Sequence, residues 1–233
     1  MIATERIPGQ QTGQTRQPRL PVIALAQATR RSHLVALDWF ERLLLLGFFG
    51  WLVARMLAHY LATRQAANLV LLPSEGLVVV LVLIRRPASQ LSRSAADWLM
   101  ALIVTCSFML VAPVSDASLI PAALGVFVVL MGTVIQIHAK MALGRSFGCV
   151  PAHRGLKLGG PYQMVRHPMY AGYLLSHMAF LAMNPTWWNA AIYAFCYGLQ
   201  IPRLLAEERL LARDPAYRSY QATVRYRLVP GVF

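Results

Sequence analysis

Charge is scarce in this sequence of 233 residues, and acidic charge is scarcer still. Asp, Glu, Lys and Arg make up 13% of the chain, whereas a soluble domain averages about 25%. Hydrophobic residues make up 57% and come in long blocks, which favours spanning helices over a barrel or one large soluble core. The sequence therefore predicts an all-α, polytopic helical membrane protein.

The residue patterns of metal and disulfide sites are also missing. The three cysteines, Cys106, Cys149 and Cys196, have no CxxC spacing, so we expect them to be packing residues. The histidines share no spacing typical of metal ligands, and we expect no metal.

The shortage of acidic residues leaves a formal charge of +13, which in a soluble protein would suggest nucleic acid. Here the basic residues fall almost wholly between hydrophobic blocks, where they indicate topology. A nucleic-acid-binding protein needs a basic face on a water-soluble element, so we expect no nucleic-acid partner.

Six apolar blocks mark candidate spans, so we expect about five to six transmembrane helices in the bilayer. Pro73 to Gly76 interrupt the second block, and a helix starting near Pro73 is expected there. Only residues 184–186 join the last two blocks, which predicts a tight helical hairpin. The blocks are Leu43–Leu61, Leu69–Ile84, Trp98–Ala112, Leu119–His138, Met169–Met183 and Trp187–Ile201.

The basic residues divide unevenly over this six-span map. Only Arg64, with Arg55 near the end of the first span, falls on one side, and nearly all the others fall on the opposite side. Because cytoplasmic loops are rich in Lys and Arg, we expect both termini in the cytoplasm.

The chain is predicted to have three parts. Residues 1–32, rich in Gln, Thr, Pro and Arg, predict a mobile cytoplasmic N-terminal arm. Residues 33–139 hold the N-terminal transmembrane helices. Residues 140–233 are the expected catalytic region, with a cofactor-binding loop, the helical hairpin and a C-terminal amphipathic helix.

Two glycines and two polar residues stand out in the fourth span. Gly125 and Gly132 lie two helical turns apart, so they share a face where another helix can approach closely. Gln136 and His138 are polar groups at membrane depth, which need a partner or a watery cavity.

Glycines and prolines cluster at the entrance to the fifth span, between Gly159 and Gly172. Pro168 suits the first turn of a helix, because the N–H that it lacks would be unpaired there, and His167 then takes the capping position. Backbone N–H groups at such an entrance can bind an anionic or polar ligand group.

An arginine and a pair of glutamates follow the hairpin. Arg203 and Glu207 are four residues apart on one helical face, and Glu208 comes next. The plain interpretation is an amphipathic helix at the membrane surface, with an arginine anchored to lipid headgroups and solvated glutamates.

Taken together, the run Gly-Pro-Tyr-x-x-x-Arg-His-Pro-x-Tyr-x-Gly, the tight hairpin and the glutamate pair resemble the isoprenylcysteine carboxyl methyltransferase family. These are membrane methyltransferases, and phospholipid methyltransferase-like proteins share a related pattern. The resemblance runs from about Leu143 through the ending at residues 224–230. Where the family usually has Phe-Gly, this chain has Asp214-Pro215, which we expect to restart the helix without touching the pocket.

The resemblance implies S-adenosylmethionine as the cofactor, bound at the cytoplasmic membrane surface. A sulfonium cation favours carboxylates and aromatic faces, and the carboxylate of the cofactor favours a helix entrance or a cation. The expected cofactor-binding residues are Gly160, Pro161, Tyr162, Val165, Arg166, His167, Pro168, Tyr170, Gly172 and Glu208.

The implied reaction is methyl transfer to a lipophilic acceptor from the lipid bilayer, first of all the carboxylate of an isoprenylcysteine-like substrate. A carboxylate is ionised at neutral pH and needs no general base, so Arg203 is expected to hold it and Glu207 to orient Arg203. These two are the predicted catalytic residues. If the acceptor were an amine, as for a phospholipid N-methyltransferase, Glu207 would remove a proton.

Two other classes of function stay open. A membrane reductase related to sterol reductases would have a similar cytoplasmic ending and would use NADPH. A transport or structural protein would need more polar residues at mid-bilayer than the two in the fourth span, which argues against it.

Overall fold

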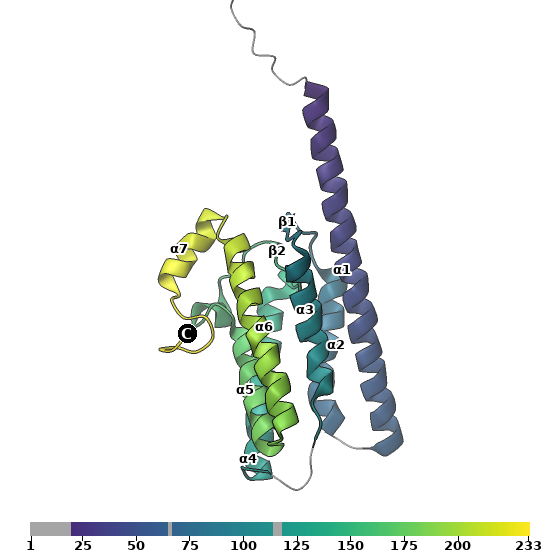
Figure 1. Ribbon diagram of the computed structural model, residues 1–233, viewed down its shortest axis with the longest axis vertical. Coiled ribbons are helices and arrows are strands. Elements are labelled where there is room, and N and C mark those ends of the chain that lie inside the picture. The colour runs from purple at the N-terminus through teal and green to yellow at the C-terminus, as the bar shows by residue number, and fades with distance from the viewer. Residues whose placement is uncertain (1–19, 65–66, 114–117) are drawn as a thin grey trace, which may run out of the picture. The chain divides into compact units, whose positions relative to one another are not determined.

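The computed structural model describes residues 20–64, 67–113 and 118–233 (Figure 1). The chain divides into two units, Met1–His33 and Leu34–Phe233. Its helices are α1 (Leu20–Thr63), α2 (Ala67–Ile84), α3 (Ala95–Ser107), α4 (Ala122–Leu143), α5 (Pro168–Met183), α6 (Trp187–Leu211) and α7 (Pro215–Thr223). The prediction of a mainly helical fold is confirmed.

Short elements connect the helices. Three 3-10 turns lie at Phe108–Leu110, Gly144–Ser146 and Gly160–Gln163. Strand β1 (Gln90–Leu91) pairs antiparallel with β2 (Ala152–His153), with Gln90 opposite His153. This two-stranded ribbon ties the segment after α2 to the segment after α4.

The N-terminal part differs from the expected arm. Helix α1 begins at Leu20, so residues 20–32 are helical, whereas the sequence predicted a mobile arm up to residue 32. Residues 1–19 lie outside the described residues.

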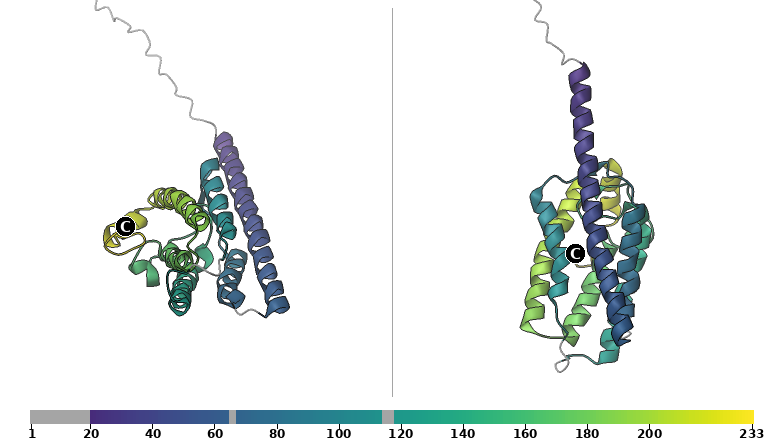
Figure 2. Two further views of the ribbon diagram at one scale, coloured as in Figure 1. Left: turned by 60° about the horizontal axis from the view of Figure 1, so that its bottom comes forward. Right: turned by 90° about the vertical axis from the view of Figure 1, so that its right-hand side faces the viewer.

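Within the second unit, successive helices from α2 to α6 run in alternating directions (Figures 1 and 2). The loops after α3 and between α5 and α6 lie at one end. The opposite end, which we call the α7 end, carries the β ribbon, residues 144–167 and the C-terminal segment. Residues from three distant parts of the sequence therefore meet at the α7 end.

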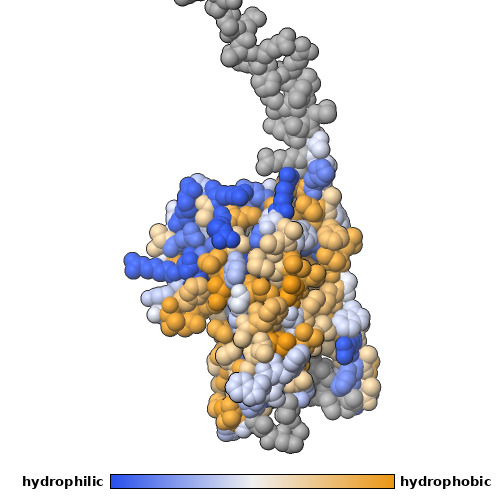
Figure 3. All heavy atoms as spheres, in the orientation of Figure 1, coloured by the Kyte–Doolittle hydropathy of each residue, from blue (hydrophilic) through white to orange (hydrophobic). Residues whose placement is uncertain are grey.

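Two helical stretches among the described residues have the length and composition of membrane spans, Arg31–Ala62 and Ala122–Ser146. Leu71–Ile84 and Ala95–Leu110 are shorter apolar stretches. Apolar side chains on these helices are exposed, and Figure 3 shows that hydrophilic residues gather chiefly around the α7 end. Because water disfavours so much exposed apolar surface, these helices indicate a membrane protein.

The second span is longer than predicted. Helix α2 starts at Ala67 and contains Pro73, whereas a start near Pro73 was expected. Proline removes one helical hydrogen bond, but an apolar segment gains from keeping all its other backbone bonds inside the helix. The polar residues beside Pro73 have a partner on α4, because Lys140 Nζ lies 2.7 Å from Ser74 Oγ and 3.7 Å from Glu75 Oε1.

Helices α4 and α5 approach closely, as the glycines predicted. A Cβ atom on Gly172 would lie 2.7 Å from the carbonyl oxygen of Gly132, so neither backbone could accept a side chain there. Gln136 Nε2 donates to Ser176 Oγ on α5 at 3.2 Å, which gives this buried amide the partner it needs. His138 is exposed.

The predicted hairpin is present between α5 and α6. Thr186 caps α6, since its hydroxyl accepts a hydrogen bond from the Asn189 N–H at 3.1 Å. Helix α6 then continues through Pro202 to Leu211, so Arg203 and the glutamates extend the sixth helix. The chain restarts as α7 after Asp214, whose carboxylate accepts from the Ala216 N–H at 2.9 Å, as predicted.

Candidate active site

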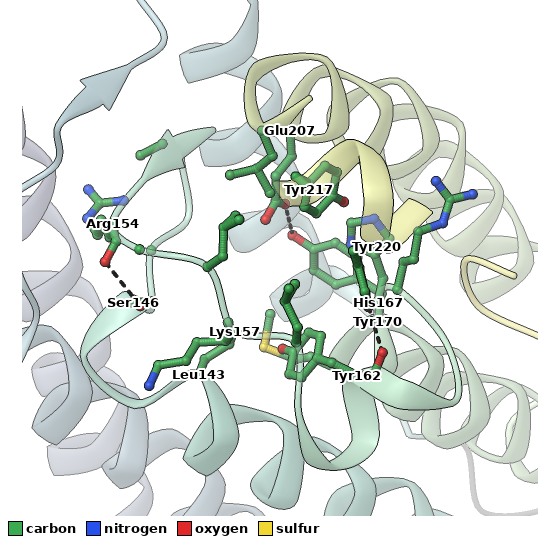
Figure 4. Close-up of a pocket in the computed structure, with 18 residues that line it drawn as sticks. Leu143, Ser146, Arg154, Lys157, Tyr162, His167, Tyr170, Glu207, Tyr217 and Tyr220 are labelled. Atoms are coloured by element: carbon green, nitrogen blue, oxygen red, sulfur yellow. Dashed lines mark hydrogen bonds between the residues drawn. The ribbon is translucent and has the colours of Figure 1, made fainter. Parts of the chain in front are cut away.

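An open cleft of about 700 Å³, including space open to solvent, lies at the α7 end. One wall is the loop from Leu143 to Leu158, and the other is formed by the entry to α5, the last turns of α6 and the tyrosines of α7. Figure 4 shows Ser146 and Lys157 on the loop side, and Tyr170, Glu207, Tyr217 and Tyr220 on the helical side.

Five of the residues predicted from the sequence line this cleft, and they include its one acidic residue. They are Tyr162, Arg166, His167, Tyr170 and Glu207. Glu207 is half-buried, and its Oε2 accepts a hydrogen bond from the Tyr170 hydroxyl at 3.3 Å. No ion pair to Glu207 is found in the part of the chain that the structure describes, so its negative charge is available to a cation in the cleft.

Glu208 points into a different environment. Its carboxylate is buried and lies 3.0 Å from Arg166 Nη1, 3.1 Å from His167 Nε2 and 3.1 Å from Arg227 Nε. Burial alone would raise the pKa of Glu208, but the hydrogen bond and charge of His167, together with Arg166 and Arg227, lower it. Glu208 is therefore a partner that holds the two cleft-lining residues Arg166 and His167, and does not itself line the cleft.

The entry to α5 is held by the C-terminal segment. His167 occupies the capping position as predicted, but its side chain makes no capping bond and contacts Glu208 instead. The N–H groups of Arg166 and His167 donate to the carbonyls of Tyr226 and Arg227 at 2.9 and 2.8 Å. Protein carbonyls thus occupy the N–H groups of the two residues that precede Pro168.

Arg203 is placed differently from the prediction. Its Nε and Nη2 donate to the Cys149 carbonyl at 3.2 and 2.6 Å, and its Nη1 donates to Gln200 Oε1 at 3.0 Å. The expected pair with Glu207 is not formed, because Glu207 accepts from Tyr170. Arg203 is buried, does not line the cleft, and lies with its guanidinium 5.6 Å from the centre of the Tyr170 ring.

Five other predicted cofactor-binding residues do not line the cleft. Gly160 opens the 3-10 turn with φ +63, a conformation that favours glycine. Pro168 is the first residue of α5, as predicted. Gly172 faces α4 rather than the cleft, because it sits against the Gly132 backbone. The remaining two are Pro161 and Val165.

The sequence missed the contribution of α7. Tyr217 and Tyr220 line the cleft, so the expectation that the restarted helix stays away from the pocket was wrong. The Tyr220 hydroxyl donates to the Tyr162 carbonyl at 2.6 Å, and burial raises the pKa of Tyr220 to about 12. Two aromatic residues three apart share one helical face, and this spacing was the available signal.

The lining residues fit a sulfonium cofactor. A bound cation would contact the Glu207 carboxylate and the rings of Tyr162 and Tyr170. A bound anionic group would contact Arg166 and Lys157. Leucines of the loop and of α6 offer an apolar surface to a ring. Among the described residues, no group of three His, Cys, Asp or Glu side chains is placed to hold a metal ion.

Residues 120–216 match the family model described as phospholipid methyltransferase. This family lies in the superfamily of membrane methyltransferases that resemble isoprenylcysteine carboxyl methyltransferase. The predicted kinship with membrane methyltransferases is confirmed. The matched residues run from the loop before α4 into α7, and they include the α5 entry, Arg203 and both glutamates. No curated protein matches the chain.

Proposed function

We propose that this protein is an integral membrane methyltransferase that binds S-adenosylmethionine in the cleft and methylates a lipophilic acceptor. The observation that supports this most directly is Glu207, the one acid that lines the cleft, which faces aromatic side chains and has no cationic partner among the described residues. A positively charged methyl donor is stabilised by such a carboxylate and by aromatic faces.

The residues of the cleft divide the work of holding the cofactor. Glu207 and the rings of Tyr162 and Tyr170 would face its sulfonium centre, and Arg166 or Lys157 would pair with its carboxylate. The cofactor supplies an activated methyl group, so the protein mainly positions donor and acceptor. Tyr170 contributes by holding Glu207 in one orientation through its hydroxyl.

The contacts of Arg203 favour an amine as the acceptor. A carboxylate acceptor needs a free cation, but the Arg203 guanidinium already donates to Cys149 and Gln200 and lies outside the cleft lining. An amine needs a group that accepts its proton. Glu207 lines the cleft and is the candidate for this proton acceptor. The matched family is named for phospholipids, which agrees with an amine-bearing headgroup. An isoprenylcysteine-like carboxylate is the second candidate.

We also propose six spans, with the α7 end and both termini in the cytoplasm. Five of the six predicted spans lie on α1, α2, α4, α5 and α6, within about three residues at each end or inside a longer helix. The third, Trp98–Ala112, begins inside α3 and runs past its end at Ser107 through the 3-10 turn Phe108–Leu110. The α7 end carries most of the basic residues, whereas Arg64 follows α1 at the opposite end. This distribution is the one that the positive-inside rule gives.

The experiment is binding and transfer in nanodiscs. Calorimetry with S-adenosylhomocysteine tests the cofactor site, and labelled methyl transfer into aminophospholipids, prenylcysteine analogues and lipophilic acids tests the acceptor. Glu207→Gln should abolish most transfer, while Arg209→Gln, a change on the exposed side of the same helix, should not. Folded protein that binds no S-adenosylhomocysteine, or that binds NADPH instead, would refute the proposal.

A further inference from the structure

A second group of buried charges lies beside the cleft. Asp38 and Glu41 on α1 face Arg85, which follows α2, and Arg154, which lies in the loop wall. The distances between charged atoms run from 2.5 to 3.3 Å, and each of the four side chains is less than a tenth exposed. Two carboxylates thus balance two guanidinium groups.

Glu41 accepts hydrogen bonds from the loop backbone, whereas Asp38 does not. Its Oε1 accepts hydrogen bonds from the backbone N–H groups of Cys149 and Val150, both at 2.9 Å, while its Oε2 pairs with Arg85 and Arg154. Among the described residues, the Asp38 carboxylate pairs with the two arginines and accepts no hydrogen bond from the loop backbone. Glu41 therefore holds the loop by its backbone as well as by charge, across 108 positions of sequence.

The peptide that Glu41 holds leads to the cleft. The carbonyl of Cys149 accepts both Nε and Nη2 of Arg203, and Arg203 lies over the ring of Tyr170. Tyr170 in turn donates to Glu207. Figure 4 shows the Arg154 side chain turned away from the cleft, so the loop lines the cleft while its arginine is held from outside.

We infer that Glu41 is a positioning residue for the active site. Its carboxylate fixes residues 149–154 of the loop wall, and through Cys149 and Arg203 it fixes the direction of the Tyr170 hydroxyl toward Glu207. The inference rests on the proposed function, because it assigns this network to the cofactor cleft. It also adds a residue of α1, which lies outside the matched residues 120–216.

Length and charge can be separated by three variants. Glu41→Asp keeps the charge but is one methylene too short to reach both the loop backbone and the arginines. Glu41→Gln keeps the length and an acceptor oxygen but loses the charge. Asp38→Asn removes a charge from the same cluster without touching the loop backbone, and is the matched control.

Two measurements apply to each variant in nanodiscs. The first is the dissociation constant of S-adenosylhomocysteine together with the turnover number at saturating substrate. A displaced active-site wall costs about 10- to 100-fold, so in folded protein Glu41→Asp should lose that much. Glu41→Gln should lose less, because its amide oxygen can still accept from the loop N–H groups, and Asp38→Asn should stay within about threefold. The second is the alkylation rate of Cys149, read by peptide mass spectrometry, which should rise several-fold in Glu41→Asp alone.

The outcomes are distinct. If the wild type binds no S-adenosylhomocysteine, the proposed function fails, and the alkylation rates still decide whether Glu41 fixes the loop. If the wild type binds but Glu41→Asp keeps its affinity, turnover and alkylation rate, only the inference about Glu41 is overturned. The inference is also overturned if affinity and turnover fall in Glu41→Gln and Asp38→Asn but not in Glu41→Asp, because the charge and not the reach of the side chain would then matter.

Discussion

Tyr170 and Glu207 meet across the cleft wall, the phenol hydroxyl at the start of α5 donating to a carboxylate near the end of α6 at 3.3 Å. The two residues are 37 positions apart, and the hairpin between them brings the two helix ends together. Tyr170 itself is buried, and the guanidinium of Arg203 lies over its ring. The orientation of the one acid that lines the cleft therefore depends on a side chain of the neighbouring helix.

Replacing Tyr170 by Phe should slow methyl transfer without unfolding the protein. The ring and its contact with Arg203 remain, but Glu207 loses the donor that orients it, a bond of about 1 kcal/mol. We expect a fall in turnover of roughly fivefold to tenfold at saturating substrate. Labelled transfer measures it, and a turnover equal to the wild type would show that the hydroxyl does not position Glu207.

Glu208→Ala should act mainly on stability. The change leaves Arg166 buried without its carboxylate, and breaking a buried ion pair on one side costs about 3–5 kcal/mol. A thermal unfolding assay in detergent should show a markedly lower midpoint. Its comparison is Glu207→Ala, which removes no ion pair and should change the midpoint little. Equal midpoints in both variants would contradict the assignment of Glu208 as the structural partner.

The contribution of Glu208 should vanish in acid. The surrounding cations lower its pKa in the folded protein below the ordinary value of 4.5. A carboxyl group with a lowered folded pKa stabilises the protein above its unfolded pKa and loses that effect as the pH falls through the folded value. The difference in unfolding midpoint between wild type and Glu208→Gln should therefore be constant above about pH 5 and shrink below about pH 4. A difference that stays constant down to pH 3 would contradict it.

Gly172→Ala should destabilise the α4–α5 contact. The new Cβ would lie 2.7 Å from the Gly132 carbonyl oxygen, and backbone cannot move aside as a side chain can. We expect a loss of about 1–3 kcal/mol, typical of overpacking. Gly198→Ala on α6 is the control, because nothing lies within 4 Å of its Cβ and alanine favours the helix. Destabilisation of equal size at both positions would rule out the close approach as the cause.

The features that the sequence predicted well depend on neighbouring residues. Pro168 starts α5 and Asp214 caps α7 because proline and a short carboxylate act on the backbone next to them. The three-residue connection predicted the hairpin. The helical repeat predicted that Gly132 lies on a face where another helix approaches closely. Each of these predictions needed only a few residues of context.

The features that it missed depend on tertiary contacts. The spacing of Arg203 and Glu207 allowed a pair, but the carbonyl of Cys149, 54 positions away, binds the arginine instead. The hydrogen bond from the Cys149 N–H to the Glu41 carboxylate joins residues 108 positions apart. Even the distinction between the two adjacent glutamates follows from which neighbours surround each one, and helical periodicity says only that they point in different directions.

The carbonyls of residues 225–227 hold the entry of α5, and this has a consequence for biogenesis. A ribosome makes Arg225 only after it has made the whole of α6 and α7, 59 residues after Arg166. The helical hairpin can therefore insert in the bilayer while Arg166 and His167 still lack their final backbone partners. Membrane insertion and completion of the cleft are thus separate events, and a nascent chain released before its last residues would be inserted with the α5 entry still unpaired.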